Sequence, residues 1–309
     1  MTTRDESGHA VMNADVAAHY RRWPFPSVEH RSREGLIFLR TVARWLEVMQ
    51  GTPRVVDVGC GTGHTVIALA RQFPDVEFTG IDLVEQAVLA ARNRVADEGL
   101  CNVRFVRADL AQPVEHVGRF DVVLCLGVLH HLPDLRLGFK HASSLLSQDG
   151  RIVLWLYGRY GRERHRLNQE LLRLLGADLR DGERLGLARA FLEDLGEPLM
   201  LNTGFYTPYG SGPEGLDWML EHPEWLADQM IPAVEHSVTL SEILSLLEDS
   251  DLELEKWLGV DRDPQAYTSQ PLLLERLRQL PDVRRLLAID LVLKPAYYFV
   301  TGVRRGRTG

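Results

Sequence analysis

Cysteine is scarce in this chain, with three residues among 309. Cys60, Cys101 and Cys125 show none of the paired spacings that zinc sites use. Cys60 and Cys125 fall at the ends of predicted buried strands, where a cysteine acts mostly as a small apolar residue. We therefore expect a protein of a reducing compartment, the cytoplasm, with no bound metal.

The sequence also lacks long apolar runs and an excess of basic residues. No run approaches 18 apolar residues, and the N-terminal MTTRDESGHA has no apolar segment of the kind found in signal peptides. The net charge is -8, whereas nucleic-acid-binding proteins usually present a basic surface. These absences predict a protein that neither spans a membrane nor binds nucleic acid.

What the chain does contain is a long alternation of predicted strands and helices over residues 54–157. Continuous apolar strands such as VVLCLGV indicate burial on both faces and therefore a parallel sheet. Strands that alternate with helices predict a doubly wound α/β fold. We expect N-terminal helices over 1–50, an α/β core over 51–158, a helical insertion over 159–237, and the last helices and strands of the core over 238–309.

The motif VVDVGCGTG places glycine at every second position near its end. Gly59, Gly61 and Gly63 permit a tight turn and a close approach of the backbone to a ligand, and the next helix would point unpaired N–H groups at that ligand. Asp57 precedes the turn, and Asp82 ends the following strand. A carboxylate at that place can accept hydrogen bonds from both hydroxyls of a ribose. The pattern predicts a cofactor that contains a nucleoside.

Two details separate this pattern from the fingerprint of NAD-binding proteins, which spaces its glycines as G-x-G-x-x-G. The third glycine comes one residue early, and His64 stands where the NAD pattern has glycine. A further carboxylate, Asp109, closes the third strand, where it can meet the exocyclic amine of an adenine. An NAD-dependent oxidoreductase is therefore the weaker alternative.

With these motifs the chain resembles the class I S-adenosylmethionine-dependent methyltransferases over roughly residues 54–158. VVDVGCGTG, GIDLV, RADL, FDVVLCLGVLHHLPD and DGRIVLWLYG carry the resemblance. It implies a Rossmann-like, mostly parallel seven-stranded sheet whose last strand, near YYFVTGVR, is reversed and forms a β-hairpin at the sheet edge. It also implies S-adenosylmethionine as the cofactor and S-adenosylhomocysteine as the product.

The resemblance further implies which residues contact the cofactor. The first motif lines its methionine part, the second binds ribose, the third flanks adenine, and the end of the fourth strand faces the sulfonium. In similar enzymes an N-terminal helix that bears a tyrosine closes over the cofactor as a lid. The residues assigned to the cofactor on this basis are Tyr20, Asp57, Gly59, Cys60, Gly61, Gly63, Asp82, Leu83, Asp109, Leu110, Leu126 and Val128.

Methyl transfer from a sulfonium is a direct displacement, which requires alignment of the reactants and exclusion of water. A base is needed only where the acceptor must lose a proton. His130 and His131 are the candidates for that base, because they lie near the expected sulfonium end and histidine titrates near neutral pH. The alternative is that either histidine only packs against the cofactor pocket.

Aromatic residues around the core are candidates for the acceptor side, with ordinary packing as the alternative for each. They come from YRRWPFPS, from the end of the fifth strand, and from GFYTPYGSGPEG in the insertion, which would be a substrate cap. Aromatics with few charges suit an apolar or aromatic acceptor, or closure against a partner subunit in a homodimer. These candidates are Trp23, Phe25, Tyr157, Tyr160, Tyr206 and Tyr209.

We therefore expect a cytoplasmic S-adenosylmethionine-dependent methyltransferase that acts on an oxygen, nitrogen or carbon nucleophile of a small molecule. No Asn-Pro-Pro-aromatic run follows the fourth strand, which argues against methylation of base amino groups in nucleic acid. A protein or peptide acceptor stays open. A cofactor-binding scaffold without methyl transfer is the alternative from another class, and the intact glycines and carboxylates weigh against it.

Overall fold

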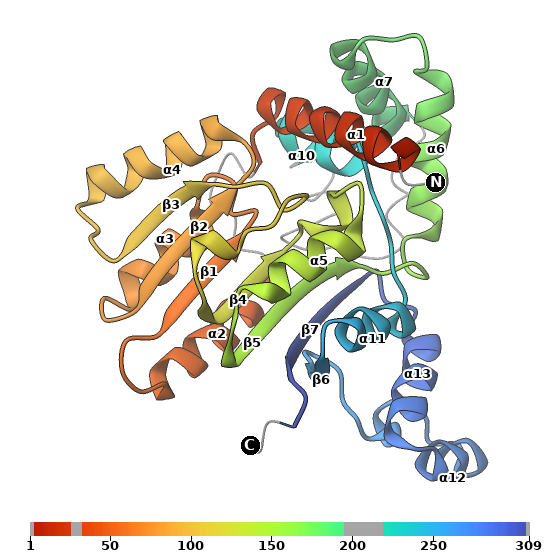
Figure 1. Ribbon diagram of the computed structural model, residues 1–309. Helices are drawn as coiled ribbons and strands as arrows, with labels where there is room; N and C mark the ends of the chain where they lie inside the picture. Colours follow the sequence, from red (N-terminus) through yellow and green to blue (C-terminus); the bar gives the residue numbers. More distant parts are fainter. Residues whose placement is uncertain (1–2, 26–32, 195–218, 307–309) are drawn as a thin grey trace.

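The computed structural model describes residues 3–25, 33–194 and 219–306 (Figure 1). Two helices, α1 (Thr3–Arg22) and α2 (Arg33–Val48), precede the sheet. The first part of the core then alternates strands and helices in the order β1 (Arg54–Val58), α3 (His64–Gln72), β2 (Glu77–Asp82), α4 (Glu85–Glu98), β3 (Val103–Arg107), β4 (Phe120–Leu126), α5 (Leu135–Ser144) and β5 (Leu146–Tyr157). Short 3-10 turns lie at η1 (Glu115–Val117), η2 (Leu129–His131) and η3 (Pro264–Ala266).

After β5 the chain leaves the sheet and returns to it. The insertion forms α6 (Glu163–Leu175), α7 (Asp181–Asp194) and α10 (Pro223–Met230), which lie near α1 (Figure 1). The chain then adds α11 (Leu240–Asp249), β6 (Leu252–Trp257), α12 (Pro271–Gln279), α13 (Asp282–Leu293) and β7 (Tyr297–Arg304). No helix in the described ranges is long and apolar enough to cross a membrane.

The seven strands form one sheet in the order β3-β2-β1-β4-β5-β7-β6. All pairs among the first five strands are parallel, and β7 runs antiparallel to both β5 and β6. The mostly parallel sheet with a reversed last strand is therefore confirmed. The expected hairpin was too simple, because η3, α12 and α13 separate β6 from β7, so no tight turn joins these two strands.

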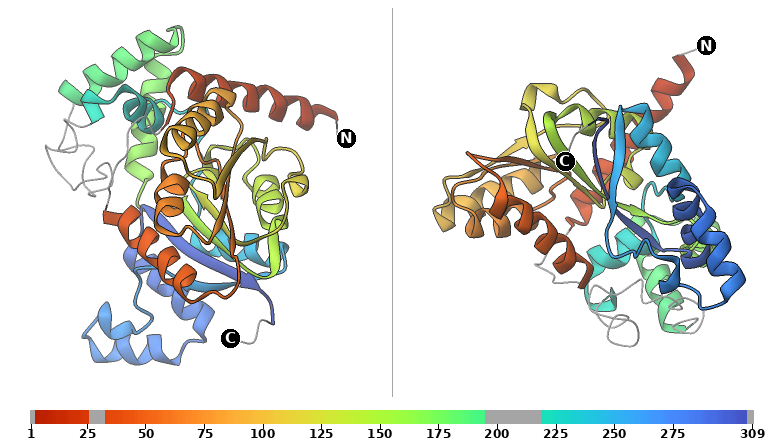
Figure 2. Two further views of the ribbon diagram at one scale, coloured as in Figure 1. Left: turned by 90° about the vertical axis from the view of Figure 1, so that its left-hand side faces the viewer. Right: turned by 90° about the horizontal axis from the view of Figure 1, so that it is seen from below.

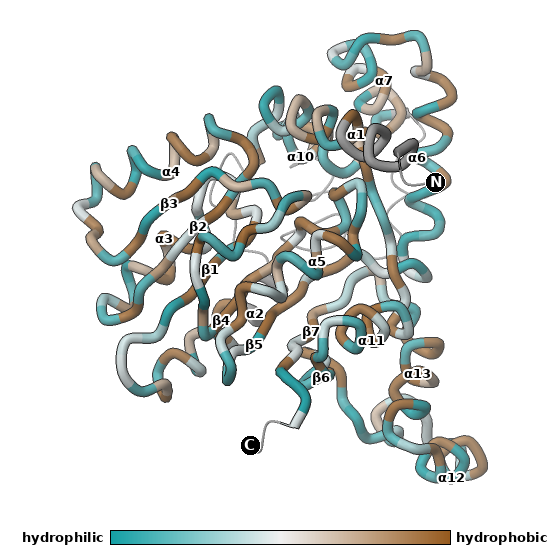
Figure 3. Tube along the Cα trace, in the orientation of Figure 1, coloured by the Kyte–Doolittle hydropathy of each residue, from teal (hydrophilic) through white to brown (hydrophobic). Residues whose placement is uncertain are grey.

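Apolar side chains cover both faces of the sheet, which explains the continuous apolar strands. Successive side chains of a strand point to opposite faces, so neighbouring Val55 and Val56 enter different hydrophobic clusters. The cluster of Val55 contains residues of α2, α3 and α4, and that of Val56 contains residues of α5, α11 and α13. Figure 2 shows these two helical layers, and Figure 3 shows the hydrophobic centre of the sheet.

Local signals in the sequence set several helix ends. Gly99 ends α4 with a left-handed φ of 64°, which glycine adopts without strain. Thr239 and Glu242 form a reciprocal capping box at the start of α11, so the first free N–H groups of that helix are satisfied. Asp134 caps α5 by accepting a hydrogen bond from the backbone N–H of Leu137 (2.9 Å).

A third hydrophobic cluster joins the insertion to the N-terminal segment. Leu172 of α6, Leu192 of α7 and Leu226 of α10 are buried together, and Trp23 and Phe25 pack against them. The residues that follow α1 thus contact the insertion, although nearly 200 positions separate Phe25 from α10 in the sequence. This packing holds α1 and α10 near each other, over the carboxyl ends of the strands (Figures 1 and 2).

Candidate active site

A cavity of about 470 Å³ opens where the carboxyl ends of the central strands meet α1 and α10. The strand order reverses between β1 and β4, and ligands of open α/β sheets bind in the crevice at such a switch point. The volume lies in the range of small-molecule and cofactor sites. Side chains from the ends of β1, β2, β4 and β5, from α1 and from α10 line the same space.

The glycine turn forms one wall of this cavity. Gly59, Gly61 and Gly63 have φ values of 68°, 53° and 79°, which favour glycine over other residues. A Cβ atom on Gly59 would lie 2.4 Å from Cγ2 of Val128, and one on Gly63 would lie 2.6 Å from Cζ of Phe105. Gly59 and Gly61 line the cavity, whereas Gly63 shapes the turn at the start of α3.

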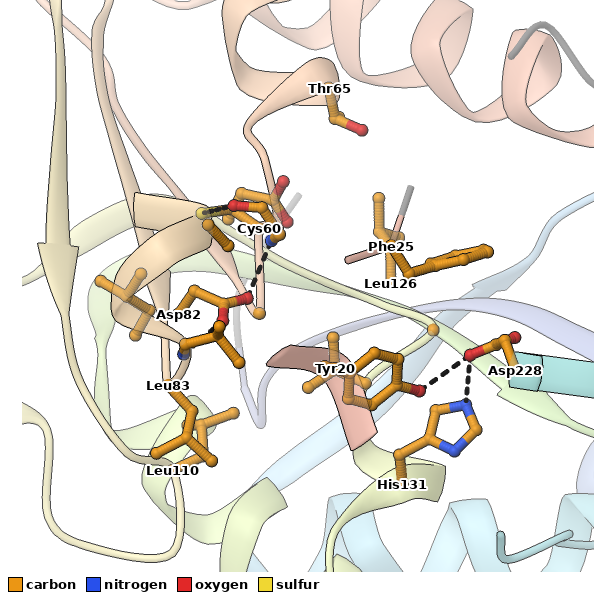
Figure 4. Close-up of a pocket in the computed structure, with 18 of the residues that line it drawn as sticks. Tyr20, Phe25, Cys60, Thr65, Asp82, Leu83, Leu110, Leu126, His131 and Asp228 are labelled. Carbon is orange, nitrogen blue, oxygen red and sulfur yellow. Dashed lines mark hydrogen bonds and ion pairs between the residues drawn. The ribbon is translucent and has the colours of Figure 1, made fainter. Parts of the chain in front are cut away.

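Asp82 holds the glycine turn in place at the end of β2. Its Oδ2 accepts a hydrogen bond from the N–H of Gly61, and its Oδ1 accepts one from the N–H of Val84, both at 2.8 Å (Figure 4). Burial raises the pKa of Asp82, and the backbone N–H groups partly offset this rise. A carboxylate offers about four acceptor positions, so Asp82 keeps capacity for the hydroxyls of a ligand.

Asp57 and Asp109 are the other two carboxylates of the cavity wall. Asp57 is 4% exposed beneath the glycine turn. Burial, followed by the negative charge of Asp82, raises the pKa of Asp57 to about 8. At the end of β3, Asp109 accepts hydrogen bonds from the N–H of Ala111 (2.8 Å) and from Nδ2 of Asn13 in α1 (2.7 Å).

A buried polar cluster of Tyr20, His131, Asp228 and Gln229 closes the other end of the cavity. The Tyr20 hydroxyl donates to Oδ1 of Asp228 at 2.8 Å, and Nε2 of Gln229 donates to Oδ2 of Asp228 at 2.8 Å. Nε2 of His131 lies 3.6 Å from Oδ1 of Asp228 (Figure 4). Three elements, α1, η2 and α10, thus meet at one carboxylate that is 3% exposed.

The tautomer of His131 follows from its second contact. Its Nδ1 lies 2.8 Å from the carbonyl oxygen of Val234. A carbonyl oxygen only accepts hydrogen bonds, so Nδ1 must carry a proton in this arrangement. Nε2 is then the ring atom that can gain or lose a proton, and it faces Asp228.

Known proteins with this architecture were found by sequence and by structure. Residues 56–152 match the family model described as a methyltransferase domain. A ubiquinone biosynthesis O-methyltransferase of Bordetella avium is 30% identical over 160 residues, which are 48% of this chain and 64% of that protein. An uncharacterized protein of Synechococcus sp. is 34% identical over 139 residues, which are 45% of this chain and 33% of that protein. The chain thus spans less than two thirds of these relatives.

Among solved structures, PKMT2 from Rickettsia typhi in complex with AdoHcy aligns with a TM-score of 0.65 at 14% identity. The alignment covers 88% of this chain and 53% of that chain, and it shows a shared fold. Residues 56–152 thus match a methyltransferase domain, in agreement with the resemblance to the class I S-adenosylmethionine-dependent methyltransferases that the motifs indicated.

The cavity gathers most of the residues expected at the cofactor. The assigned residues that line it are Tyr20, Asp57, Gly59, Cys60, Gly61, Asp82, Leu83, Asp109, Leu110, Leu126 and Val128. Figure 4 shows Asp82, Leu83 and Leu110 on one side of the space and the polar cluster on the other. Their roles toward the cofactor stay predictions, but their common location is a property of the fold.

The two adjacent histidines, His130 and His131, lie in different surroundings. His131 lines the cavity. His130, in contrast, is 1% exposed and stacks on the ring of Tyr157, with 3.7 Å between the ring centroids. Both ring nitrogens of His130 lack a hydrogen-bond partner within the described part of the chain. Burial lowers the pKa of His130 well below its usual value. Of the two predicted bases, only His131 is placed to meet a ligand in this cavity.

The aromatic residues expected at the acceptor also separate into groups. Phe25 and Tyr157 line the cavity, Trp23 packs in the third hydrophobic cluster, and Tyr160 is 38% exposed. Tyr206 and Tyr209 lie outside the described residues.

Sequence reasoning missed Asn13, which donates a hydrogen bond to Asp109. It also missed several residues that line the cavity, namely Trp155, Trp225, Asp228, Gln229 and Phe299. Trp155 had a usable signal, because it lies two positions before Tyr157 on β5 and therefore shares its face. Asp228 had none, since PEWLADQM reads as an ordinary helix with an acidic residue.

A low pH is expected to weaken the docking of α1 against the rest of the protein, because His19 then binds a proton. This residue is 8% exposed, and its Nε2 has no hydrogen-bond partner in the ranges that the structure describes. Burial lowers the pKa of His19 from 6.5 to about 4. Undocked α1 binds a proton below pH 6.5 and docked α1 does not, so docking is fully stable above pH 6.5 and weakens as the pH falls toward 4.

Hydrogen-exchange protection factors of α1, measured between pH 7 and pH 4.5, check this expectation. They should fall with pH in the wild type and change much less in His19→Gln, which is uncharged throughout this range. An equal loss of protection in both proteins would show that another group controls the docking of α1. The protection of α13, which packs against the main core through Leu286 and Ile289, serves as the internal control.

Proposed function

We propose that this methyltransferase moves the methyl group of S-adenosylmethionine to a nucleophile of a small molecule. One observation carries the proposal. A single cavity joins the glycine turn and the carboxylates Asp82 and Asp109 at one end to the polar cluster at the other. A nucleoside-bearing donor and an acceptor can therefore meet in one cavity.

The residues of the first end fit S-adenosylmethionine. Asp82 has acceptor capacity left for the two ribose hydroxyls, and Asp109 can accept a hydrogen bond from the adenine amine. Leu83 and Leu110 supply apolar surface beside these carboxylates. The glycine turn keeps the backbone close to the space where the methionine part would lie, because a Cβ at Gly59 has no room.

The cofactor supplies a methyl group on a positively charged sulfur, which is already activated for direct displacement. The protein then has to orient the acceptor and exclude water. Val16, Ala17 and Tyr20 of α1 and Trp225 of α10 line the cavity, so these two helices shield part of it from solvent. The mechanism needs no further cofactor for this step.

A small acceptor suits the cavity better than a protein side chain does. The wall has a large apolar area, with Phe25, Trp155, Trp225 and Phe299 among its residues, and α1 and α10 cover part of it. Relatives named ubiquinone biosynthesis O-methyltransferase also favour a small-molecule acceptor.

Calorimetric titration with S-adenosylmethionine, S-adenosylhomocysteine and NAD, in parallel, tests the proposal. We expect Kd values in the micromolar range for the first two, about -8 kcal/mol in binding free energy, and no binding of NAD. Binding of NAD alone would show that the glycine spacing was misinterpreted. Binding of none of the three would favour a scaffold that keeps the fold without the cofactor.

A further inference from the structure

We infer that the acceptor is an aromatic hydroxyl compound, that its hydroxyl binds between Asp228 and His131, and that Tyr20 occupies this position when no acceptor is bound. The inference rests on the proposed function and specifies its substrate class. It makes His131 the group that takes the acceptor proton. Asp228 is then a positioning residue that orients the hydroxyl and the imidazole.

The first argument is that the site already holds an aromatic hydroxyl. The phenol of Tyr20 lies in the cavity and donates to Oδ1 of Asp228 at 2.8 Å (Figure 4). Tyr20 belongs to α1, which also forms part of the cover of the cavity, so it can withdraw without disturbing the sheet. A phenolic acceptor would offer Asp228 the same donor in the same chemical form.

The second argument concerns the gap between Asp228 and His131. Their closest atoms, Oδ1 and Nε2, are 3.6 Å apart, which is too long for a direct hydrogen bond. A hydroxyl oxygen beside this gap can lie within hydrogen-bond distance of both atoms, and its single proton can pass from a hydrogen bond with Oδ1 to one with Nε2. Nδ1 of His131 is fixed by the carbonyl of Val234, so Nε2 is oriented toward that position.

The third argument is the balance of charge. Asp228 is almost completely buried, and His131 is the one basic side chain within ion-pair distance of it in the part of the chain that is described. Arg162, the other buried cation nearby, is paired with both carboxylate oxygens of Glu235 (3.0 and 2.7 Å). A buried carboxylate without a full counter-charge stabilises a cation that forms beside it.

The step itself balances with these groups alone. The acceptor oxygen forms a bond to the methyl carbon, the bond between that carbon and sulfur breaks, and its electron pair stays on sulfur. The hydroxyl proton moves to Nε2 of His131. One positive charge therefore disappears at sulfur and one appears on the imidazole, next to the Asp228 carboxylate.

The fourth argument explains why the hydroxyl should be aromatic. A phenol has a pKa of about 10, within reach of a histidine base, whereas an aliphatic alcohol holds its proton much more strongly. The wall beside the polar cluster also suits a ring. Trp155 lies nearly parallel to Phe299 (5.7 Å between centroids), and Phe25 meets Trp225 edge to face (4.6 Å).

Matched pairs of acceptors test the inference in a radiolabelled methyl-transfer assay. Phenol, 2-naphthol and 4-hydroxybiphenyl are each compared with the corresponding aromatic thiol. The thiol reacts as a thiolate that forms near neutral pH without a base. In Asp228→Asn and His131→Ala we expect kcat/KM for the hydroxyl compounds to fall on the order of 100-fold, while transfer to the thiols falls much less.

Two further variants make the result specific. Glu224→Gln makes the same chemical change as Asp228→Asn on the same helix, at a residue that does not line the cavity, and it should leave the ratio of hydroxyl to thiol transfer unchanged. Tyr20→Phe should lower KM for the hydroxyl compounds, because the competing hydroxyl is gone. An unchanged or raised KM for the hydroxyl compounds in Tyr20→Phe would show that Tyr20 does not occupy the acceptor position and would overturn the inference.

The remaining outcomes separate this inference from the proposed function. Equal losses for hydroxyl and thiol acceptors in Asp228→Asn would mean that Asp228 only supports the fold, and would overturn it. Binding of S-adenosylmethionine without transfer to any member of the three pairs would also overturn the acceptor class, while the methyltransferase proposal would stand. Absence of cofactor binding would reject the proposed function itself.

Discussion

Replacing Asp82 with alanine is expected to weaken the binding of S-adenosylhomocysteine by more than about 1.5 kcal/mol, or more than tenfold in Kd. The carboxylate is the proposed acceptor for the ribose hydroxyls, and hydrogen bonds to a charged group are worth this much. It also accepts hydrogen bonds from the N–H groups of Gly61 and Val84. Calorimetric titration of the variant measures the loss directly.

The two roles of Asp82 can be separated with a second ligand. S-adenosylhomocysteine that lacks the 2′-hydroxyl should bind the wild type more weakly than the parent compound does. In Asp82→Ala the two ligands should bind almost equally, because the partner of that hydroxyl is gone. If the analogue loses the same affinity in both proteins, Asp82 supports only the glycine turn, and the proposed ribose contact is wrong.

Glu77→Ala provides the matched control for this cycle. Glu77 begins β2 at the opposite end of the strand from Asp82, and its side chain is 65% exposed. Removing its carboxylate changes the net charge by the same amount as Asp82→Ala. It should leave both ligands with their wild-type affinities, since a charge at that end of the strand cannot contact the cavity.

The sheet and the end of the cavity that contains the glycine turn were predictable because their signals are local. The φ values of the glycine turn explain why residues 59, 61 and 63 are glycine. Asp57 and Asp82 lie near the ends of the neighbouring parallel strands β1 and β2, which must bring them to the same edge of the sheet. The burial of the central strands was also predictable from a local signal, the run of apolar residues. Val55 and Val56 are both completely buried, as a run of apolar residues in a central parallel strand requires.

The polar cluster was not predictable, because it depends on contacts between distant segments. Tyr20 and Asp228 are 208 positions apart and meet only after the insertion has packed against the N-terminal segment. No periodicity in PEWLADQM distinguishes Asp228 from a surface carboxylate. The choice between His130 and His131 was equally hidden, since the short turn η2 points consecutive side chains in different directions.

The hairpin that was expected at the sheet edge shows that the connection between two strands is harder to predict than the strands themselves. The strand patterns of β6 and β7 were recognisable, and their antiparallel pairing is real. What strand patterns do not specify is the path between two strands. Here the chain forms η3, α12 and α13 before it returns, and α13 contributes Leu286 and Ile289 to the main core. Burial of that helix, rather than turn chemistry, determines the connection.

The second large effect is expected in the stability of Asp57→Asn as a function of pH. Burial raises the pKa of Asp57 from 3.8 to about 8 in the folded protein. Between these values the folded state holds a proton that the unfolded state has released. The stabilising contribution is therefore complete below about pH 4 and is lost as the pH rises toward 8. Asparagine cannot ionise, so the variant escapes this loss.

The free energy of unfolding of the ligand-free wild type, relative to that of Asp57→Asn, should thus fall by about 1.4 kcal/mol per pH unit in this range. That amounts to roughly 3 kcal/mol between pH 5 and pH 7. Urea unfolding of both proteins at pH 5, 6 and 7 measures the difference, and its slope is independent of any constant packing defect in the variant. Asp97→Asn, at an exposed site on α4, should show no such slope. Parallel curves for wild type and Asp57→Asn would mean that Asp57 is ionised in the folded protein, because its burial would then be compensated by interactions with the glycine turn.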